Sequence, residues 1–423
     1  MSEAAYGKRN YLKITLRKLF YFIFRIYKSF FSFFFLKQQN DIKRISTFPI
    51  ISDYSQLYDI LNRLSWSIPY KKGIKIFVQV DRSINVDNLN YDPKIKGQRL
   101  YIKKSNKHII LTHKKIINSD LFLCINYKSI QLFNPFYVAK SDIFDKRFYL
   151  LTESYLSQKL FNNCHSIIEN QNLYNTSLKN FVKLTSEFKD FKDSYCFVTG
   201  PSFDSYKSLK FKKNSVKVIC NSIVKNTSFL SYINGPDILV FADPVFHFGP
   251  SEYSAKFRDA VVEVYRKYKP YIIVPYYCEA LLLSHYPQFR EKLIGMRIMK
   301  SSINFPNKNK FYVNASGNIL TLFMLTLASS ISNNIFILGA DGRNPNENYF
   351  WKHSNAVQFE GLMDSVFKTH PSFFRDRSYE DYYKSHCKYL ENLIEFGEEQ
   401  GKKYLSLNKS YIAALNNRLY KVV

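Results

Sequence analysis

Small and polar residues follow short apolar segments in the C-terminal half of the chain, and their types suit the binding of a phosphorylated ligand. In chain order these groups are Gly200-Pro201-Ser202, Asn221-Ser222, Asp243-Pro244, Ser316-Gly317-Asn318 and Gly339-Ala340-Asp341. Backbone N–H groups at the start of a helix bind phosphate, and a glycine there allows close approach. We therefore expect one crevice for a nucleotide or a nucleotide-sugar, and these residues to contact it: Gly200, Ser202, Asn221, Asp243, Ser316, Gly317 and Asp341.

Histidines that can serve as a general base lie downstream of these groups. Five of the eight histidines follow residue 240. Two of them, His353 and His370, lie in an aromatic-rich stretch beyond Asp341, together with Tyr349. Such a stretch can close over a substrate as a mobile loop, and a histidine in it can remove a proton from an acceptor hydroxyl.

Each of these residues, taken alone, also fits a structural role. Serine commonly caps a helix, glycine and proline form turns, and a histidine is often a hydrogen-bonded surface residue. Turns alone are a weaker explanation for four of these groups occurring together in this order, namely those at Gly200, Asn221, Asp243 and Ser316, so we favour a functional site.

The elements that position these groups alternate between strands and helices. The polar residues follow β-type runs such as 196–198, 218–220 and 335–338. Helical stretches are expected at 254–268, 278–285, 318–330 and 379–400. Alternating strands and helices imply right-handed parallel crossovers, and ligands of such sheets lie beyond the carboxyl ends of the strands. The predicted fold is α/β, with a Rossmann-like, mostly parallel sheet in the C-terminal domain.

A second, smaller α/β pattern precedes it. Residues 73–80 alternate like a strand, 99–102 and 108–112 predict a hairpin, and 120–125 predict a further strand. This part carries no group of residues suited to chemistry. We expect residues 41–190 to form an accessory α/β domain and helical linker, and residues 191–423 to form the catalytic domain.

Residues 1–40 read as a basic amphipathic helix, and no acidic residue lies between Glu3 and Asp41. At 100° per residue, a basic side lies opposite an apolar side. The basic residues are Lys13, Arg17, Lys18, Arg25 and Lys28, and the apolar ones are Leu19, Phe22, Ile23, Ile26, Phe30 and Phe33. We expect this helix to lie on an anionic membrane surface, on the cytoplasmic face of the inner membrane. The alternatives are a spanning helix, which Arg25 and Lys28 disfavour, and a helix packed on the protein's own body.

Composition narrows the classes of partner. The chain has 423 residues and a formal net charge of +27. The basic residues are spread along it, and Lys, Asn, Ile, Tyr and Phe are enriched together, as an AT-rich genome would encode. We find no nucleic-acid-binding motif, so we expect no nucleic-acid partner. None of the six cysteines has C-x-x-C spacing, which indicates reduced thiols and no metal site.

The strand-end groups resemble those of the bacterial sialyltransferases of glycosyltransferase family 42, and of a related Rossmann-type family of motility accessory factors and pterin diphosphokinase-like proteins. The similar elements are Gly200-Pro201-Ser202, Cys220-Asn221, Val240–Pro244, Ala315-Ser316-Gly317, Leu338–Asp341, His353-Ser354 and Lys403–Leu407. The resemblance covers about residues 194–415.

This resemblance implies a metal-independent, inverting transfer of a sugar from a CMP-activated donor. Asn221 and Asp243 would contact the nucleotide or its phosphate, Ser316 and Gly317 would hold the phosphate, and Asp341 would lie near the ribose or sugar. A downstream histidine, His353 or His370, would be the base, and Tyr349 would assist the leaving phosphate.

The chain departs from the family at two positions and in one spacing. The family usually has Asn where Asp243 stands and Thr where Ala315 stands, and a carboxylate at 243 repels phosphate unless it is protonated or paired. The family histidine lies further from its Ser-Gly than His353 does from Gly317, and His370 matches that separation better, so both histidines remain candidates.

The function expected from the sequence is therefore that of a membrane-associated glycosyltransferase of bacterial surface-polysaccharide synthesis. Its partners would be a CMP-linked acidic-sugar donor and a glycan or lipid-linked acceptor, without a cofactor. The alternatives are a pterin-type diphosphokinase, which would need ATP and Mg²⁺ at Asp243 or Asp341, and a non-catalytic scaffold of the same fold.

Overall fold

The computed structural model describes residues 11–35, 42–68, 73–86, 108–130, 134–148, 167–343, 353–371 and 379–420. The chain divides into two compact units. The first comprises residues 1–170, 244–255 and 362–377, and the second comprises residues 171–243, 256–361 and 378–423. Each unit contains its own sheet, and every strand pairing in both sheets is parallel. The protein is thus an α/β protein, consistent with a Rossmann-like fold.

The first unit has a five-stranded sheet of order β3-β2-β1-β4-β5. Its strands are β1 (Arg44–Phe48), β2 (Lys75–Gln79), β3 (Ile109–Thr112), β4 (Leu121–Cys124) and β5 (Ser141–Ile143). Helix α2 (Tyr54–Ser67) begins at Asp53, whose carboxylate accepts the Gln56 N–H, and packs its apolar side on one face of this sheet. Strand β3 pairs in parallel with β2; the other arm of the expected hairpin, 99–102, lies outside the described residues.

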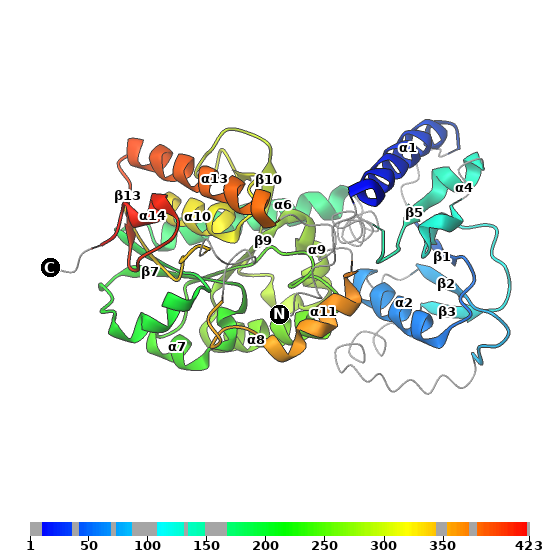
Figure 1. The fold of residues 1–423 in the computed structure, drawn as a ribbon, viewed down its shortest axis with the longest axis horizontal. Coiled ribbons are helices and arrows are strands. Elements are labelled where there is room, and N and C mark those ends of the chain that lie inside the picture. The colour runs from blue at the N-terminus through cyan, green and yellow to red at the C-terminus, as the bar shows by residue number, and fades with distance from the viewer. Residues whose placement is uncertain are drawn as a thin grey trace. The chain divides into compact units, whose positions relative to one another are not determined.

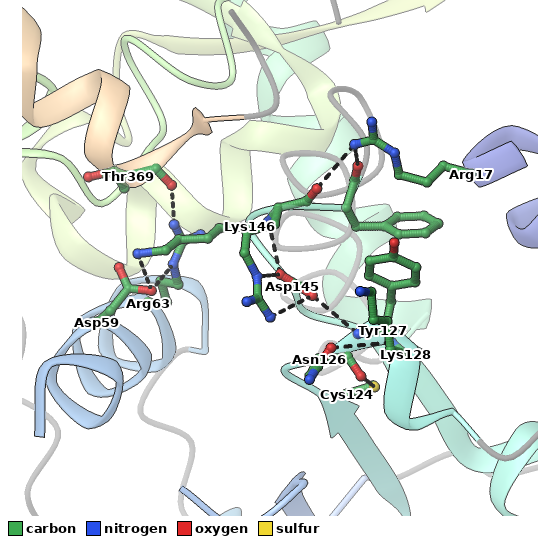
Figure 2. Close-up of polar contacts among 12 residues, drawn as sticks. Arg17, Asp59, Arg63, Cys124, Asn126, Tyr127, Lys128, Asp145, Lys146 and Thr369 are labelled. Atoms are coloured by element: carbon green, nitrogen blue, oxygen red, sulfur yellow. Dashed lines mark hydrogen bonds and ion pairs between the residues drawn. The ribbon is translucent and has the colours of Figure 1, made fainter. Parts of the chain in front are cut away.

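Two distant segments complete the first unit beside α2. Asn62 donates to the Pro250 carbonyl at 2.9 Å, and the Trp66 indole donates to the Phe248 carbonyl at 2.6 Å. Arg63, which is buried, pairs with Asp59 and donates to the carbonyl of Thr369, at the end of α11 (Met363–Thr369) (Figure 2). Residues 244–255 and 362–377 therefore belong to the N-terminal unit in space.

Helix α1 (Tyr11–Phe35) packs against α4 (Pro135–Lys140) (Figure 1). The side that holds it is largely the basic one: Arg17 donates to the Phe148 carbonyl at 2.9 Å (Figure 2), and Lys28 pairs with Asp142 at 2.5 Å. Phe24 is buried with Phe148 in a small cluster. The opposite side exposes apolar side chains, namely Leu12, Leu16, Leu19, Phe22, Ile26, Tyr27, Phe30 and Phe33. Among the described residues, no helix is both long and apolar enough to cross a bilayer.

The second unit has an eight-stranded sheet of order β11-β10-β9-β8-β7-β6-β12-β13. The strands are β6 (Asp193–Phe197), β7 (Ser215–Cys220), β8 (Ile238–Val240), β9 (Tyr271–Pro275), β10 (Leu293–Met299), β11 (Tyr312–Asn314), β12 (Asn334–Leu338) and β13 (Lys403–Ser406). From β6 to β11 the chain moves stepwise to one edge, and then β12 returns to the other side of β6. Nearly all apolar residues of β6, β7, β8, β9 and β12 are fully buried, which explains their continuous apolar sequence.

The connecting helices are α6 (Ile167–Glu187), α7 (Thr227–Tyr232), α8 (Glu252–Tyr268), α9 (Tyr276–His285), α10 (Leu325–Ile331), α13 (Tyr379–Glu399) and α14 (Ala413–Asn416). Of these, α8, α9 and α13 lie within two residues of the ranges that the sequence predicts, whereas α7 and α14 were not predicted. A single π-helical turn, η6 (Leu320–Met324), leads directly into α10. Short 3-10 turns η3 (Pro201–Ser208) and η4 (Asn221–Lys225) follow β6 and β7.

Candidate functional site

The direction of strand order reverses between β6 and β12, and several candidate residues lie just beyond the carboxyl ends of these two strands. Open parallel sheets bind ligands at such a switch point, because the connections diverge there and leave a crevice. Gly200 and Ser202 follow β6, and Asp341 follows β12. Side chains 139 residues apart in sequence are thereby brought together.

Asp341 is bound directly to the turn after β6. Its carboxylate accepts the backbone N–H of Ser202 at 3.2 Å and the Ser202 hydroxyl at 2.9 Å. Burial raises the pKa of Asp341, while the bonds from Ser202 oppose that rise. The bonds from Ser202 therefore fix the orientation of the carboxylate.

Two glycines allow this close approach. The Gly200 N–H donates to the Gly339 carbonyl at 2.8 Å. A Cβ on Gly200 would overlap the Asp341 carboxylate and the Gly339 carbonyl, and one on Gly339 would overlap the Val198 carbonyl. Gly339 also has a φ of +86°, which only glycine adopts readily. Both glycines are buried, and their lack of side chains lets the two turns pack directly against each other.

His353 and Ser354 join the same turn. An imidazole nitrogen of His353, Nδ1, lies 2.8 Å from the Thr199 hydroxyl. The Ser354 N–H donates to the Thr199 carbonyl at 2.8 Å, and its hydroxyl donates to Asp204 at 2.6 Å. Burial lowers the pKa of His353 to about 4. The imidazole is neutral at pH 7, which is the form that can accept a proton.

Asn221 and Asp243 follow the next two strands of the sheet, β7 and β8. Asn221 has a φ of +49°, and its side-chain oxygen is buried with no hydrogen-bond partner among the described residues. A buried amide oxygen without a partner is costly, which fits a position that a ligand would satisfy. Asp243 is half-buried at the end of β8.

Ser316 and Gly317 lie beyond β11, where the chain enters the π-helical turn. The side chain of Asn318, not that of Ser316, accepts the Leu320 N–H and begins the helix. Ser316 instead lies 2.9 Å from Thr321 through their hydroxyls. The two residues border a cavity of about 170 Å³ with Ala315, Thr321, Tyr382, Ser385, His386 and Tyr389.

Helix α13 connects this cavity with the strand-end crevice. Tyr382 lies against Gly317, where a Cβ would overlap its ring. The next residue, Tyr383, accepts the backbone N–H of Arg343 at 3.0 Å, two residues beyond Asp341. Adjacent residues of α13 therefore contact Gly317 and the segment that follows Asp341.

Two further candidates are His370 and Tyr349. His370 belongs to the first unit, where it is buried next to Gly249. Tyr349 lies outside the described residues. The described residues contain no cluster of histidine, cysteine and acidic side chains that could hold a metal ion.

Sequence reasoning did not single out four side chains of this region: Thr199, Asp204, Tyr382 and His386. Burial lowers the pKa of His386 to about 4, so it too is neutral at pH 7. A signal was present, because Tyr382, Ser385, His386 and Tyr389 recur at spacings of three and four residues, which places them on one face of a helix.

Comparisons with protein-family models, with curated proteins and with solved structures find no match to this chain.

Proposed function

We propose that this chain is a glycosyltransferase that moves a sugar from a nucleotide-activated donor to a glycan or lipid-linked acceptor. The observation that carries the proposal is that the turn after β6 holds Asp341 through Ser202 and a neutral His353 through Thr199, at the switch point of a parallel sheet. Open parallel sheets bind ligands at such a switch point, and the half-buried imidazole of His353 would serve as the base.

The roles follow from chemistry. Backbone N–H groups near Gly317, the Ser316 hydroxyl and the Asn221 side chain would hold the nucleotide and its phosphate. Asp341 would accept a hydrogen bond from a ribose or sugar hydroxyl while Ser202 keeps it oriented. As the acceptor oxygen bonds to the anomeric carbon, its proton passes to His353, and the bond from that carbon to the nucleotide phosphate breaks.

A CMP-linked acidic sugar is the proposed donor, and no metal or nucleic-acid partner is part of the proposal. The high positive charge of the chain, +27, suits anionic ligands and an anionic membrane.

Contact with a membrane is proposed through the exposed apolar side of α1. Phe22, Phe30 and Phe33 are 62%, 59% and 84% exposed, while Arg17 and Lys28 hold the opposite side to the first unit. An exposed row of this kind, flanked by Lys18 and Arg25, fits an interfacial helix that keeps a peripheral enzyme near a lipid-linked acceptor on the cytoplasmic face of the inner membrane.

The test is a thermal-shift screen of CMP, CDP, UDP, GDP and ATP, each with and without Mg²⁺. We expect CMP to raise the midpoint without Mg²⁺, and to lose that effect in the Asp341→Ala variant. Stabilisation by ATP alone, and only with Mg²⁺, would favour a diphosphokinase and overturn the proposal. Absence of any nucleotide effect, in a protein that melts cooperatively, would favour a non-catalytic scaffold.

A further inference from the structure

A cavity of about 440 Å³ lies in the first unit, in the part of the chain where the sequence shows no group suited to chemistry. Its lining residues among those described are Phe48, Pro49, Ile50, Gln79, Lys115, Ile116, Phe122, Ser129, Ile130, Tyr137, Val138 and Ser141. This volume is in the range of small-molecule sites, which are mostly apolar with a few placed polar groups.

The cavity lies on the face of the sheet opposite α2. Strand residues alternate between faces, and the register pairs Ser46 with Phe122 and Phe122 with Ser141. Phe48, Phe122 and Ser141 therefore share one face, while Ile45 and Leu123 point to the other face and pack with α2. Strand order also reverses between β1 and β4, the strands that contribute Phe48 and Phe122. This sheet thus has its own cavity at its own switch point.

Lys115 is the only charged side chain among the described lining residues. The acidic groups of neighbouring segments are already engaged. Asp142 pairs with Lys28 at 2.5 Å, Asp120 accepts the N–H groups of Lys43 and Arg44, and Asp145 pairs with Arg147 (Figure 2). The charge that the cavity offers a ligand is therefore positive.

The segment that carries Lys115 is held by a buried amide. Gln79 accepts the Ile116 N–H at 2.9 Å and donates to the Thr47 carbonyl, so its side chain ties the end of β1 to the segment after β3. On the other flank, the Lys114 N–H is bound by the Thr112 hydroxyl at 3.0 Å. The backbone on both sides of Lys115 is fixed, and its exposed side chain belongs to the lining of the cavity.

We propose that this cavity binds a small amphipathic anion, whose apolar body lies among Phe48, Phe122 and Tyr137 and whose carboxylate or sulfonate pairs with Lys115. The site is separate from the nucleotide crevice proposed above and does not depend on it.

The experiment is a fluorescence titration of the full-length protein with 8-anilino-1-naphthalenesulfonate, followed by competition with decanoate or decan-1-ol. We expect the dye to bind at one saturable site. Decanoate should displace the dye, and decan-1-ol, which lacks the charge, should displace it only at much higher concentration. Lys115→Met should weaken dye binding about tenfold, as expected for a lost bond to a charged group. Lys114→Met, which changes an adjacent exposed lysine outside the lining, should change it less than about twofold.

Two further variants separate this site from other apolar surface. Ile50→Trp puts a bulky indole ring at an exposed position of the cavity lining and should block the site while Lys115 stays intact. Phe22→Ser/Phe30→Ser removes the exposed apolar row of α1 and should leave the saturable site unchanged. The proposal is overturned if the α1 variant weakens dye binding while Lys115→Met and Ile50→Trp do not. It is also overturned if Lys114→Met weakens dye binding as much as Lys115→Met does, or if decan-1-ol displaces the dye as well as decanoate does. Melting curves of each variant confirm that it is folded.

Discussion

Ser202 donates to Asp341 through both its backbone N–H and its hydroxyl, although these residues follow strands separated by most of the second unit's sequence. The pair joins the segments that follow β6 and β12, and the neighbouring glycines let their backbones approach closely. Changes at this junction should therefore affect ligand binding and stability together.

Gly200→Ala should destabilise the second unit and weaken nucleotide binding, because the added methyl group overlaps the Asp341 carboxylate and the Gly339 carbonyl. Overpacking of this kind costs about 1–3 kcal/mol. Gly361→Ala is the matched control, since a Cβ there meets nothing within 4 Å. Urea unfolding measures the free energy of each variant, and equal values for the two would contradict the geometry described for Gly200.

His353 should determine how activity and stability respond to acid. Its pKa of about 4 lies below the ordinary value of 6.5, so the unfolded chain takes up this proton first as the pH falls. The stabilising contribution of the neutral imidazole is complete above pH 6.5 and is lost between pH 6.5 and 4, by roughly 1–3 kcal/mol.

His353→Asn should therefore lose less stability than the parent protein between pH 6.5 and 4, and should lose transferase activity at every pH. Replacement of the exposed His113 by Asn should change neither the loss of stability in acid nor the activity. The readouts are thermal midpoints across this range and initial rates with the donor found by the nucleotide screen. A variant that retains full activity would rule out His353 as the base.

Glu279 should make the second unit less stable as the pH rises. It is buried, its Oε1 accepts the Ser177 hydroxyl at 2.7 Å, and its Oε2 has no partner among the described residues. Burial raises the pKa of Glu279 to about 8. The protonated form is fully favourable below pH 4.5, and its contribution is lost as the pH rises from 4.5 through 8, by on the order of a few kcal/mol.

Glu279→Gln should accordingly gain thermal stability relative to the parent at pH 8 and show little difference at pH 5. Glu263→Gln is the control, because Glu263 is an exposed partner of Arg266. If the advantage of Glu279→Gln were the same at both pH values, the raised pKa would be wrong.

The exposed apolar row of α1 should determine membrane binding. Phe22→Ser/Phe30→Ser should greatly reduce cosedimentation with anionic vesicles, because each phenyl ring contributes apolar area at the interface. Ile117→Ser/Met299→Ser, which changes two exposed apolar residues elsewhere, should bind as the parent does. Removal of residues 1–37 should release the protein from membranes, and persistent binding of that truncated protein would contradict the role of α1.

The sequence by itself determined the elements and their order. Apolar runs of three or four residues, followed closely by Gly, Asn or Asp, predicted strands at β6, β7, β8 and β12, and the ranges of α8, α9 and α13 were predicted to within two residues. These features depend on local periodicity and on turn residues, which act over a few positions.

Only the tertiary structure decided which strands are neighbours and which groups are buried. The insertion of β12 beside β6 brings Asp341 to Ser202, and the packing of residues 362–377 onto the first unit gives His370 a different setting from His353. Helical periodicity separated the two sides of α1, but packing on α4 decided that Arg17 and Phe24 face the protein. Strand pairing and desolvation are sums of contacts between residues far apart in sequence, so neither the crevice nor the pKa values of His353 and Glu279 are encoded in any local pattern.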